Sequence, residues 1–250
     1  MFFFNYQIAN LYKNASKKSE VVTQILYGES FKIISKKNKW LKIKTTFDNY
    51  IGYIHNINYR DRFRATHKIY RLKTKIFKKP IYTKKYETKS YLTFASKISI
   101  VQKYKNFVEY EKDKWIQKKD IKKIEHTEKN YLKILKLFLG IKYVWGGKSF
   151  KGIDCSAILQ LVFFYNTKFY PRDTKDQVKY LKKNIKRKNF KKGDIIFWKG
   201  HVAICISNKR LIHAFGPRKK VIIMDIKKTI NEIKNNSKLS IIGRKNINDY

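Results

Sequence analysis

Residues 143–157 read Tyr-Val-Trp-Gly-Gly-Lys-Ser-Phe-Lys-Gly-Ile-Asp-Cys-Ser-Ala, and they place Cys155 between a glycine-rich loop and an expected helix. From Ile158 onward, apolar residues recur at the i, i+3, i+4 and i+7 spacing of one helical face, which predicts an amphipathic helix. Cys155 then lies in the first helical turn, where unpaired N–H groups and the helix dipole favour thiolate over thiol. The alternative is a buried structural cysteine, because free cysteines are among the most buried residues.

Two predicted strands further along the chain, 201–206 and 210–215, each carry a histidine. Side chains alternate between the two faces of a strand, so the length of the connecting loop decides whether His213 shares the face of His201. A two-residue turn places His213 on the opposite face. A three-residue loop or a bulge pairs His213 with Ala203, diagonal to His201. We predict the odd loop.

Cys155, His201 and His213 together fit nucleophilic attack on an amide. A thiolate attacks the carbonyl, a histidine takes up and returns the proton, and a third polar group orients that histidine. In chain order, the three residues are the expected nucleophile, acid–base and orienting residue. A zinc site is the main alternative, but it lacks the close-spaced ligand pair that is usual in zinc sites. We predict no metal and no cofactor, and a packing role for Cys205 beside His201.

Other elements of the C-terminal half follow from capping and periodicity. A helix is expected to open near Glu128 and to end at Gly140. Thr174 and Gln177 fit a capping box for a second helix, with Val178 and Leu181 facing inward. A turn at 192–194 precedes a buried strand at 195–198.

The N-terminal half alternates short β-rich runs with turns, which predicts small barrels. Runs at 21–26, 31–34, 39–43 and 50–54 form a first unit. A weaker echo at 93–100, 106–110 and 114–116 indicates a second, divergent unit, in which Phe107 takes the place of Trp40 and Trp115 that of Tyr53. The alternative is that these later strands belong to the first domain.

Composition sets the broad class. The 250 residues include 43% hydrophobic side chains, enough for packed cores, and the formal net charge is +41. Nucleic-acid or anionic-membrane binding would explain that charge. The lysines are spread along all segments, however, and we favour a general compositional bias. Two cysteines make no disulfide framework, and the first residues lack a recognisable signal peptide, so we expect a cytoplasmic location, with export left open.

The motifs of the C-terminal half resemble the NlpC-type cell-wall peptidases, which are papain-like cysteine hydrolases. The resemblance covers about 128–250 and rests on ordered motifs at 143–147, 152–156, 171–174, 193–198, 200–202 and 211–214. One departure is Ala157, where glycine is usual. The first N-terminal unit resembles a bacterial SH3-like domain in its Gly-Glu turn, its central Trp strand and its Gly-Tyr-Ile strand. The resemblance implies an α+β chain with helices packed on an antiparallel sheet. Its expected domains are an SH3-like domain at 1–60, a divergent one at 61–125 and the peptidase at 126–250.

This layout is similar to that of γ-D-glutamyl-L-diamino-acid endopeptidases of the dipeptidyl peptidase VI type. The similarity implies cleavage of peptidoglycan stem peptides that have a free N-terminal L-alanine. It also implies substrate-binding roles for Asp154 and Ser156, with Asp154 holding the substrate ammonium. Tyr50 and, more weakly, Glu29 are candidates from the first SH3-like domain.

Four further residues near the nucleophile complete the expected site. Tyr143 and Trp145 are expected to line the cleft, with the Tyr143 hydroxyl aiding the oxyanion together with N–H groups at the helix start. We expect Asp173 to contact substrate and Arg172 to brace the loop.

The expected partner is therefore a peptidoglycan-derived peptide, with no specific nucleic acid and no membrane span. One alternative is another amidase specificity on the same fold, acting on intact cell wall. A catalytically idle wall- or polyanion-binding protein is a further alternative.

Overall fold

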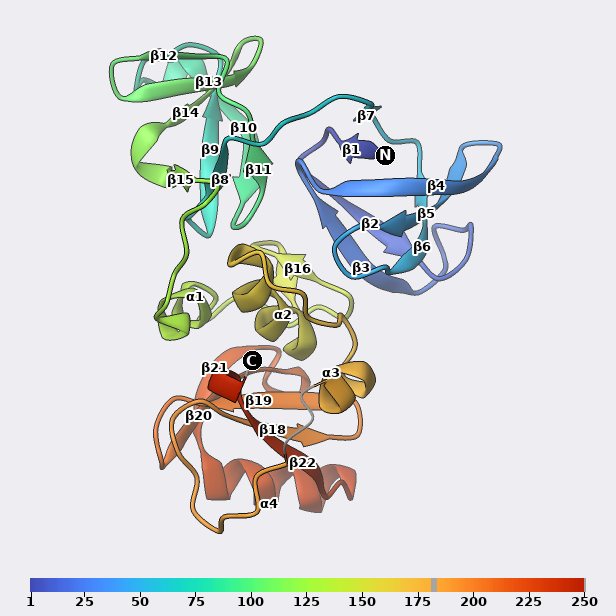
Figure 1. Ribbon diagram of the computed structural model, residues 1–250, viewed down its shortest axis with the longest axis vertical. Coiled ribbons are helices and arrows are strands. Elements are labelled where there is room, and N and C mark those ends of the chain that lie inside the picture. The colour runs from blue at the N-terminus through green and yellow to red at the C-terminus, as the bar shows by residue number, and fades with distance from the viewer. Residues whose placement is uncertain (181–183, 250) are drawn as a thin grey trace. The chain divides into compact units, whose positions relative to one another are not determined.

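The computed structural model describes residues 1–180 and 184–249, and it divides the chain into two compact units, Met1–Thr127 and Glu128–Tyr250. The first unit is built of strands, and the second packs α-helices against an antiparallel sheet (Figure 1). The predicted α+β class is therefore confirmed. In the described part of the chain, no helix is long and apolar enough to cross a membrane.

The first half of the first unit is one seven-stranded antiparallel sheet with the order β3-β2-β6-β5-β4-β1-β7. Its strands are β1 (Phe2–Phe4), β2 (Ile8–Tyr12), β3 (Val21–Leu26), β4 (Ser30–Lys37), β5 (Trp40–Thr45), β6 (Ile51–His55) and β7 (Tyr59–Arg60). Alternation decides which side chains enter the core: Leu41 and Ile43 of β5 are buried, and Lys42 and Lys44 alternate with them on the other face. Strands lie where the four predicted runs were expected.

The second half of this unit repeats that topology. Its strands are β8 (His67–Ile69), β9 (Lys73–Phe77), β10 (Glu87–Thr93), β11 (Lys97–Ile98), β12 (Gln102–Tyr104), β13 (Phe107–Glu111), β14 (Lys114–Gln117) and β15 (Ile121–Lys123). The order β10-β9-β14-β13-β12 matches β3-β2-β6-β5-β4 strand for strand. The expected equivalence of Phe107 with Trp40 follows, since each opens the corresponding strand. That residues 61–125 form a domain of their own remains a prediction.

The continuous strand expected at 93–100 is wrong. β10 ends at Thr93 and β11 begins at Lys97, and the chain passes between two sheets at this point. Ala95 takes up a left-handed conformation with φ 65°, which ends the strand. No glycine or asparagine marks this turn in the sequence, so the alternation of residues alone predicted one continuous strand.

Two hydrogen bonds connect the two halves of the first unit. The Lys97 N–H donates to the carbonyl of Tyr27 at 2.9 Å, and the Tyr27 hydroxyl lies 3.2 Å from the Glu111 carboxylate. The backbone fits closely because residue 28 is glycine: a Cβ there would lie 2.2 Å from the carbonyl oxygen of Lys97.

The second unit is centred on a five-stranded antiparallel sheet with the order β21-β20-β19-β18-β22. Its helices are α1 (Tyr131–Leu137), α2 (Cys155–Tyr165), α3 (Thr174–Tyr180) and α4 (Ile226–Ser237). Its sheet strands are β18 (Asp194–Trp198), β19 (His201–Cys205), β20 (Arg210–Phe215), β21 (Lys220–Asp225) and β22 (Ile241–Asn246), and β16 (Lys148–Ser149) and β17 (Gly152–Ile153) form a small hairpin before α2. Figure 1 shows α2 on one side of the main sheet and α4 on the other.

Two helix predictions need correction. The helix after Cys155 is not amphipathic: all its residues are buried, because α2 packs against α1 and against strands of the main sheet. The capping box is also wrong. Helix α3 already includes Thr174, and the Gln177 amide donates to the carbonyls of Ser156 and Pro171, at 3.0 and 2.9 Å. Leu181 lies outside the described residues.

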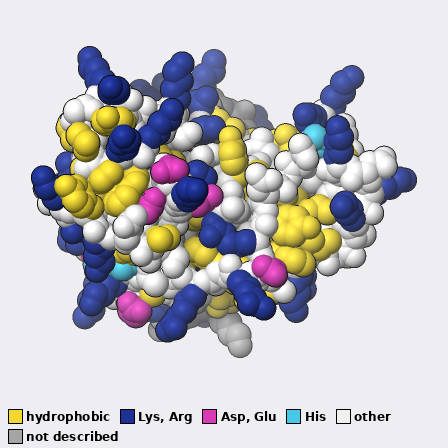
Figure 2. All heavy atoms as spheres, turned by 90° about the horizontal axis from the view of Figure 1, so that it is seen from above, with side chains coloured by type: hydrophobic (Ala, Val, Ile, Leu, Met, Phe, Trp, Pro, Cys, Tyr) yellow, Lys and Arg dark blue, Asp and Glu magenta, His cyan; other side chains and the backbone are white. Residues whose placement is uncertain are grey.

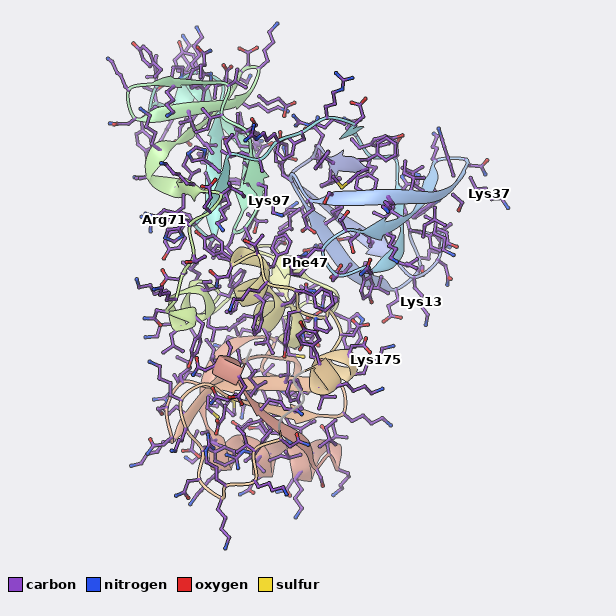
Figure 3. All side chains as sticks on the ribbon, in the orientation of Figure 1. Lys13, Lys37, Phe47, Arg71, Lys97 and Lys175 are labelled. Carbon is purple, nitrogen blue, oxygen red and sulfur yellow. The ribbon has the colours of Figure 1, made fainter. Side chains whose placement is uncertain are left out.

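The positive charge is distributed over the surface. On the face drawn in Figure 2, Lys and Arg side chains are scattered among hydrophobic and neutral ones. Lys13, Lys37 and Lys175, labelled in Figure 3, are exposed and come from distant parts of the sequence. This distribution agrees with a compositional bias.

Candidate active site

Cys155 is the first residue of α2, and a tight loop before it fixes its position. Asp154 caps the helix, and its carboxylate accepts from the N–H of Ala157 at 2.8 Å and from that of Gly146 at 3.0 Å. The loop needs glycine at 147, where a Cβ would lie 2.5 Å from the carbonyl oxygen of Gly152. The glycine-rich sequence thus places the thiol at a helix start, as predicted.

Asp154 is also half of a buried ion pair. Arg172 donates to both of its carboxylate oxygens, at 3.0 and 2.6 Å, and to the Ser156 hydroxyl at 2.8 Å. The side chains of Arg172 and Asp154 are 1% and 8% exposed. The expected bracing role of Arg172 is confirmed. The Asp154 carboxylate, which was expected to hold the substrate ammonium, thus already has a cationic partner. A substrate ammonium would have to share this carboxylate with Arg172.

The histidines face one another across β19 and β20. Ile204 pairs with Ile212, which puts His213 opposite Ala203, and the loop between the strands is the predicted three-residue one. The Nε2 atom of His201 lies 2.9 Å from Nδ1 of His213. The prediction that the two imidazoles share a face is therefore confirmed. A two-residue turn at Lys199–Gly200, with φ 76° at Gly200, sets His201 at the very start of β19.

His213 is fully buried, and its second nitrogen also has a neighbour. Its Nε2 lies 3.3 Å from the thioether sulfur of Met224, and its ring stacks on Phe215 with centroids 4.5 Å apart. The two imidazole nitrogens that face each other leave no space for a metal ion between them. Among the described residues, no group of three His, Cys, Asp or Glu side chains is arranged to hold a metal.

Burial separates the pKa values of the candidate nucleophile and base. It raises the pKa of the Cys155 thiol to about 12, with a further increase from Asp154, against hydrogen bonds from the Val202 N–H and the Thr174 side chain and the charge of Arg172. Burial lowers the pKa of His201 to about 4. Burial, and then the neighbouring His201, hold the pKa of His213 well below 6.5. All three shifts favour the uncharged form of the side chain.

The thiol lies against the start of β19. Its Sγ is 3.9 Å from the carbonyl oxygen of Gly200, the residue that precedes His201. In the part of the chain that the structure describes, no hydrogen bond joins Sγ to the His201 ring. Hydrogen bonds between catalytic residues are often long before substrate binds, so the lack of this bond is compatible with Cys155 and His201 acting together.

Tyr143 lies near the thiol, and Trp145 is exposed. Burial raises the pKa of Tyr143, and the Asp154 carboxylate and the thiolate form of Cys155 raise it further, which indicates that the phenol lies close to both groups. The Tyr143 ring packs beside Gly216, where a Cβ would lie 3.7 Å from it. Trp145 is 57% exposed, so its ring is available to a ligand.

The remaining predicted site residues differ in their surroundings. The half-buried Asp173 precedes α3, and its carbonyl accepts from the N–H of Asp176 and of Gln177. Tyr50, in the first unit, has its N–H on the Thr45 hydroxyl at 2.8 Å. Glu29 is 3% exposed, and its carboxylate accepts from the Leu26 N–H at 3.1 Å, within its own turn. Tyr50 and Glu29 belong to the first unit, and Asp173 belongs to the second.

Two residues of the site were missed in the sequence. Thr174 is buried and its side chain bonds to the Cys155 thiol. Met224 contacts His213. Thr174 belongs to the motif at 171–174, so a role in the site could have been predicted from the sequence. Met224 is brought to His213 only by the pairing of β20 with β21.

A cysteine at a helix start, opposite two imidazoles carried on an antiparallel sheet, defines the class of papain-like thiol hydrolases. Comparison with known proteins supports this class. Residues 140–236 match the NlpC/P60 family, and residues 9–57 match the bacterial SH3 domain. The chain therefore carries an NlpC/P60 domain, the domain of a family of cysteine peptidases, and a bacterial SH3 domain ahead of it.

Two curated relatives match most of the chain. It is 28% identical over 233 residues to dipeptidyl-peptidase 6 of Lysinibacillus sphaericus, covering 83% of this chain and 84% of that protein. It is 23% identical over 236 residues to γ-D-glutamyl-L-lysine dipeptidyl-peptidase of Bacillus subtilis, covering 85% and 78%. A solved NlpC/P60 protein from Bacillus cereus has the same fold, with a TM-score of 0.81 at 17% identity and 98% coverage of both chains.

Proposed function

We propose that this protein hydrolyses the bond between γ-D-glutamate and the diamino acid in peptidoglycan stem peptides that have a free N-terminal L-alanine. The observation that carries the proposal is the extent of the similarity. The match to two dipeptidyl-peptidases covers 83% and 85% of the chain, which is more than the peptidase domain alone. The substrate is a peptidoglycan-derived peptide, and no specific nucleic acid is required.

In this proposal Cys155 is the nucleophile and His201 is the base. The imidazole takes the thiol proton as Sγ attacks the γ-carbonyl carbon. The same proton passes to the amine of the diamino acid as the C–N bond breaks, which leaves a thioester on Cys155. Water then attacks the thioester with His201 as base, and the dipeptide L-Ala-D-Glu leaves. His213 holds the His201 ring through their 2.9 Å contact.

Electrostatic stabilisation of the oxyanion comes from groups next to the thiol. The first N–H groups of a helix have no partner within the helix, and the N–H of Cys155 is such a donor. The Tyr143 hydroxyl is the second donor. Its raised pKa keeps it protonated, as a hydrogen-bond donor must be.

Recognition of the substrate amino terminus is assigned to Asp154, Ser156 and Asp173, with Tyr50 contributed by the first unit. An ammonium adjoining the Asp154–Arg172 pair would take part of the carboxylate charge and so lower the pKa of the Cys155 thiol. Trp145 offers an exposed face to the rest of the peptide. Glu29 is left out, because its carboxylate is buried and bonded in its own turn.

A second candidate is hydrolysis of intact cell wall. Relatives named endopeptidases support it through higher identity over a shorter stretch. One is a probable endopeptidase NlpC homologue of Haemophilus influenzae, 36% identical over 81 residues, which covers 31% of this chain and 43% of that protein. The short match speaks for the shared peptidase fold and less for a shared substrate.

The test is incubation with the free tripeptide L-Ala-γ-D-Glu-L-Lys and, separately, with intact sacculi, followed by mass spectrometry of the products. We expect L-Ala-D-Glu from the free tripeptide and not from sacculi. Tyr50→Phe should raise KM for the tripeptide, while Tyr53→Phe, three residues away, serves as the matched control. Release from sacculi alone would favour the second candidate.

We also propose that the protein acts in the cytoplasm, on peptides returned from the wall. Its cysteines, Cys155 and Cys205, are both free thiols, as a reducing compartment requires. Cell fractionation with a specific antibody tests the location, and recovery in the medium or wall fraction would contradict it.

A further inference from the structure

The buried imidazole of His213 makes contacts through both of its nitrogens. Nδ1 faces Nε2 of His201 at 2.9 Å, and Nε2 faces Sδ of Met224 at 3.3 Å. Met224 reaches it from β21, where Ile222 pairs directly with His213 and Met224 lies two residues further along the same face. His201, His213 and Met224 therefore form one series of contacts that leads from the start of β19 into the core.

The last member of this series fixes where the protons lie. A thioether sulfur accepts hydrogen bonds and has no proton to donate. A neutral His213 carries one N–H, and the contact with sulfur is attractive only when that N–H is on Nε2. If the proton were on Nδ1, the lone pair of Nε2 would face the lone pairs of the sulfur at a fully buried position, since His213 is 0% exposed.

The consequence passes to His201. With the proton of His213 on Nε2, Nδ1 is an acceptor, and Nε2 of His201 must donate to it. A neutral imidazole has a single proton, so the lone pair of His201 is then on Nδ1. That nitrogen is the one directed away from His213, and it is the one free to receive a proton from a thiol.

We propose that Met224 is a positioning residue of the active site: by accepting the Nε2–H of His213, it selects the His201 tautomer whose Nδ1 accepts the Cys155 proton. The inference rests on the proposed roles of Cys155 and His201. It adds that a thioether does the work that an orienting carboxylate or amide does in other sites. Packing alone is the competing role of Met224, which also contacts the apolar cluster around Trp198 and Leu211.

The composition of the chain allows a clean test. It has two methionines, Met1 and Met224, so replacing methionine throughout by norleucine changes one internal side chain. Norleucine has a methylene in place of sulfur and keeps the size while removing the acceptor. Selenomethionine keeps an acceptor at the same place and is the matched control. Met1 is 62% exposed and lies in the other unit, so its replacement does not alter the surroundings of His213.

Two measurements separate positioning from packing. Two-bond ¹H–¹⁵N correlation spectra give the tautomers of His201 and His213 without any substrate. We expect Nε2–H for both in the methionine and selenomethionine proteins, and a mixture in the norleucine protein. We also expect norleucine to lower kcat about tenfold with KM unchanged, and selenomethionine to retain kcat.

Two results would overturn the inference: Nδ1–H on His213 in the native protein, or native tautomers and kcat in the norleucine protein. Failure of the proposed function appears differently, as absence of hydrolysis by the native protein, or as hydrolysis that survives Cys155→Ala. The tautomer spectra decide the role of Met224 in either case. A melting temperature equal in the three proteins shows that loss of kcat is not loss of folding.

Discussion

At the scale of single residues, the resting state of Cys155 is set by burial. The thiol lies at a helix start, which favours the anion, yet burial and the Asp154 carboxylate outweigh that effect and raise its pKa to about 12. Burial also makes His201 a poor proton acceptor, since it lowers the pKa of the imidazole to about 4. In our proposal, the reactive ion pair forms when substrate binds and its ammonium adjoins the Asp154–Arg172 pair.

This resting state predicts the pH dependence of thiol alkylation. With the thiol protonated up to pH 9, the rate of alkylation of Cys155 by iodoacetamide should rise about tenfold per pH unit from pH 6 to pH 9, without a plateau. The measurement uses the Cys205→Ala protein, so that a single thiol reacts. A rate that is constant between pH 5 and pH 8 would reveal a preformed thiolate–imidazolium pair and would contradict the assignment.

The Asp154–Arg172 pair predicts a difference between buried and exposed ion pairs. Arg172→Ala leaves an uncompensated buried carboxylate and should lower the free energy of unfolding by about 3 kcal/mol or more. Arg218→Ala, which removes the exposed contact with Glu232 at 3.2 Å, should change it by about 1 kcal/mol at most. Urea denaturation of both variants checks this. Equal losses in the free energy of unfolding would show that the buried pair stabilises the fold no more than the exposed one.

At the scale of elements, the site depends on two backbone features that the sequence determines. One is the three-residue loop between β19 and β20, which puts both histidines on one face. The other is the glycine-rich loop before α2, which brings the Gly146 N–H to Asp154. Both features are local in the sequence, so the spacing of the histidines and the glycine content indicated where they lie.

The glycine-rich loop yields a stability prediction. Gly147→Ala puts a Cβ 2.5 Å from a backbone oxygen that cannot move without the loop. It should lower the free energy of unfolding by about 1–3 kcal/mol and reduce kcat, because Asp154 and Cys155 shift with the loop. Gly216→Ala is the matched control, since its Cβ meets the nearest atom of Tyr143 at 3.7 Å. If Gly147→Ala unfolds like the native protein, this loop is not rigid.

At the scale of the whole molecule, the charge of +41 comes from lysines and arginines in all parts of the sequence. Retention on a polyanion column should be strong at low salt and lost by about 1 M salt, where the screening length is about 3 Å. Single changes such as Lys13→Gln, Lys37→Gln or Lys175→Gln should each move elution slightly and by similar amounts. A change that abolishes retention would instead identify a specific binding patch.

The sequence predicted the parts of the fold that depend on local chemistry. Cys155 follows a capping aspartate, and short runs separated by turns gave β3, β5 and β6 nearly residue for residue. Failures came where tertiary structure overrides a local pattern. The left-handed turn at Ala95 has no sequence marker, and helix α2 is enclosed on all sides although its spacing resembles that of a surface helix.

The candidate site shows the same division. His201 and His213 share a face because three residues connect their strands, and this odd loop was the predicted one of the two alternatives. The partner of Asp154 could not be deduced, because Arg172 approaches it from a loop that comes after α2. Met224 was beyond prediction, since the register of β20 against β21 depends on a turn at 216–219 whose length the sequence alone does not define.

The central claim is that Cys155 is the nucleophile that cleaves the γ-D-glutamyl bond. The most direct test is the rate of L-Ala-D-Glu release from L-Ala-γ-D-Glu-L-Lys by two variants that differ only in which thiol is lost. Cys155→Ala should lower the rate at least about 10³-fold, while Cys205→Ala, a buried core position, should retain most of it. Persistent release by Cys155→Ala, or loss confined to Cys205→Ala, would contradict the claim.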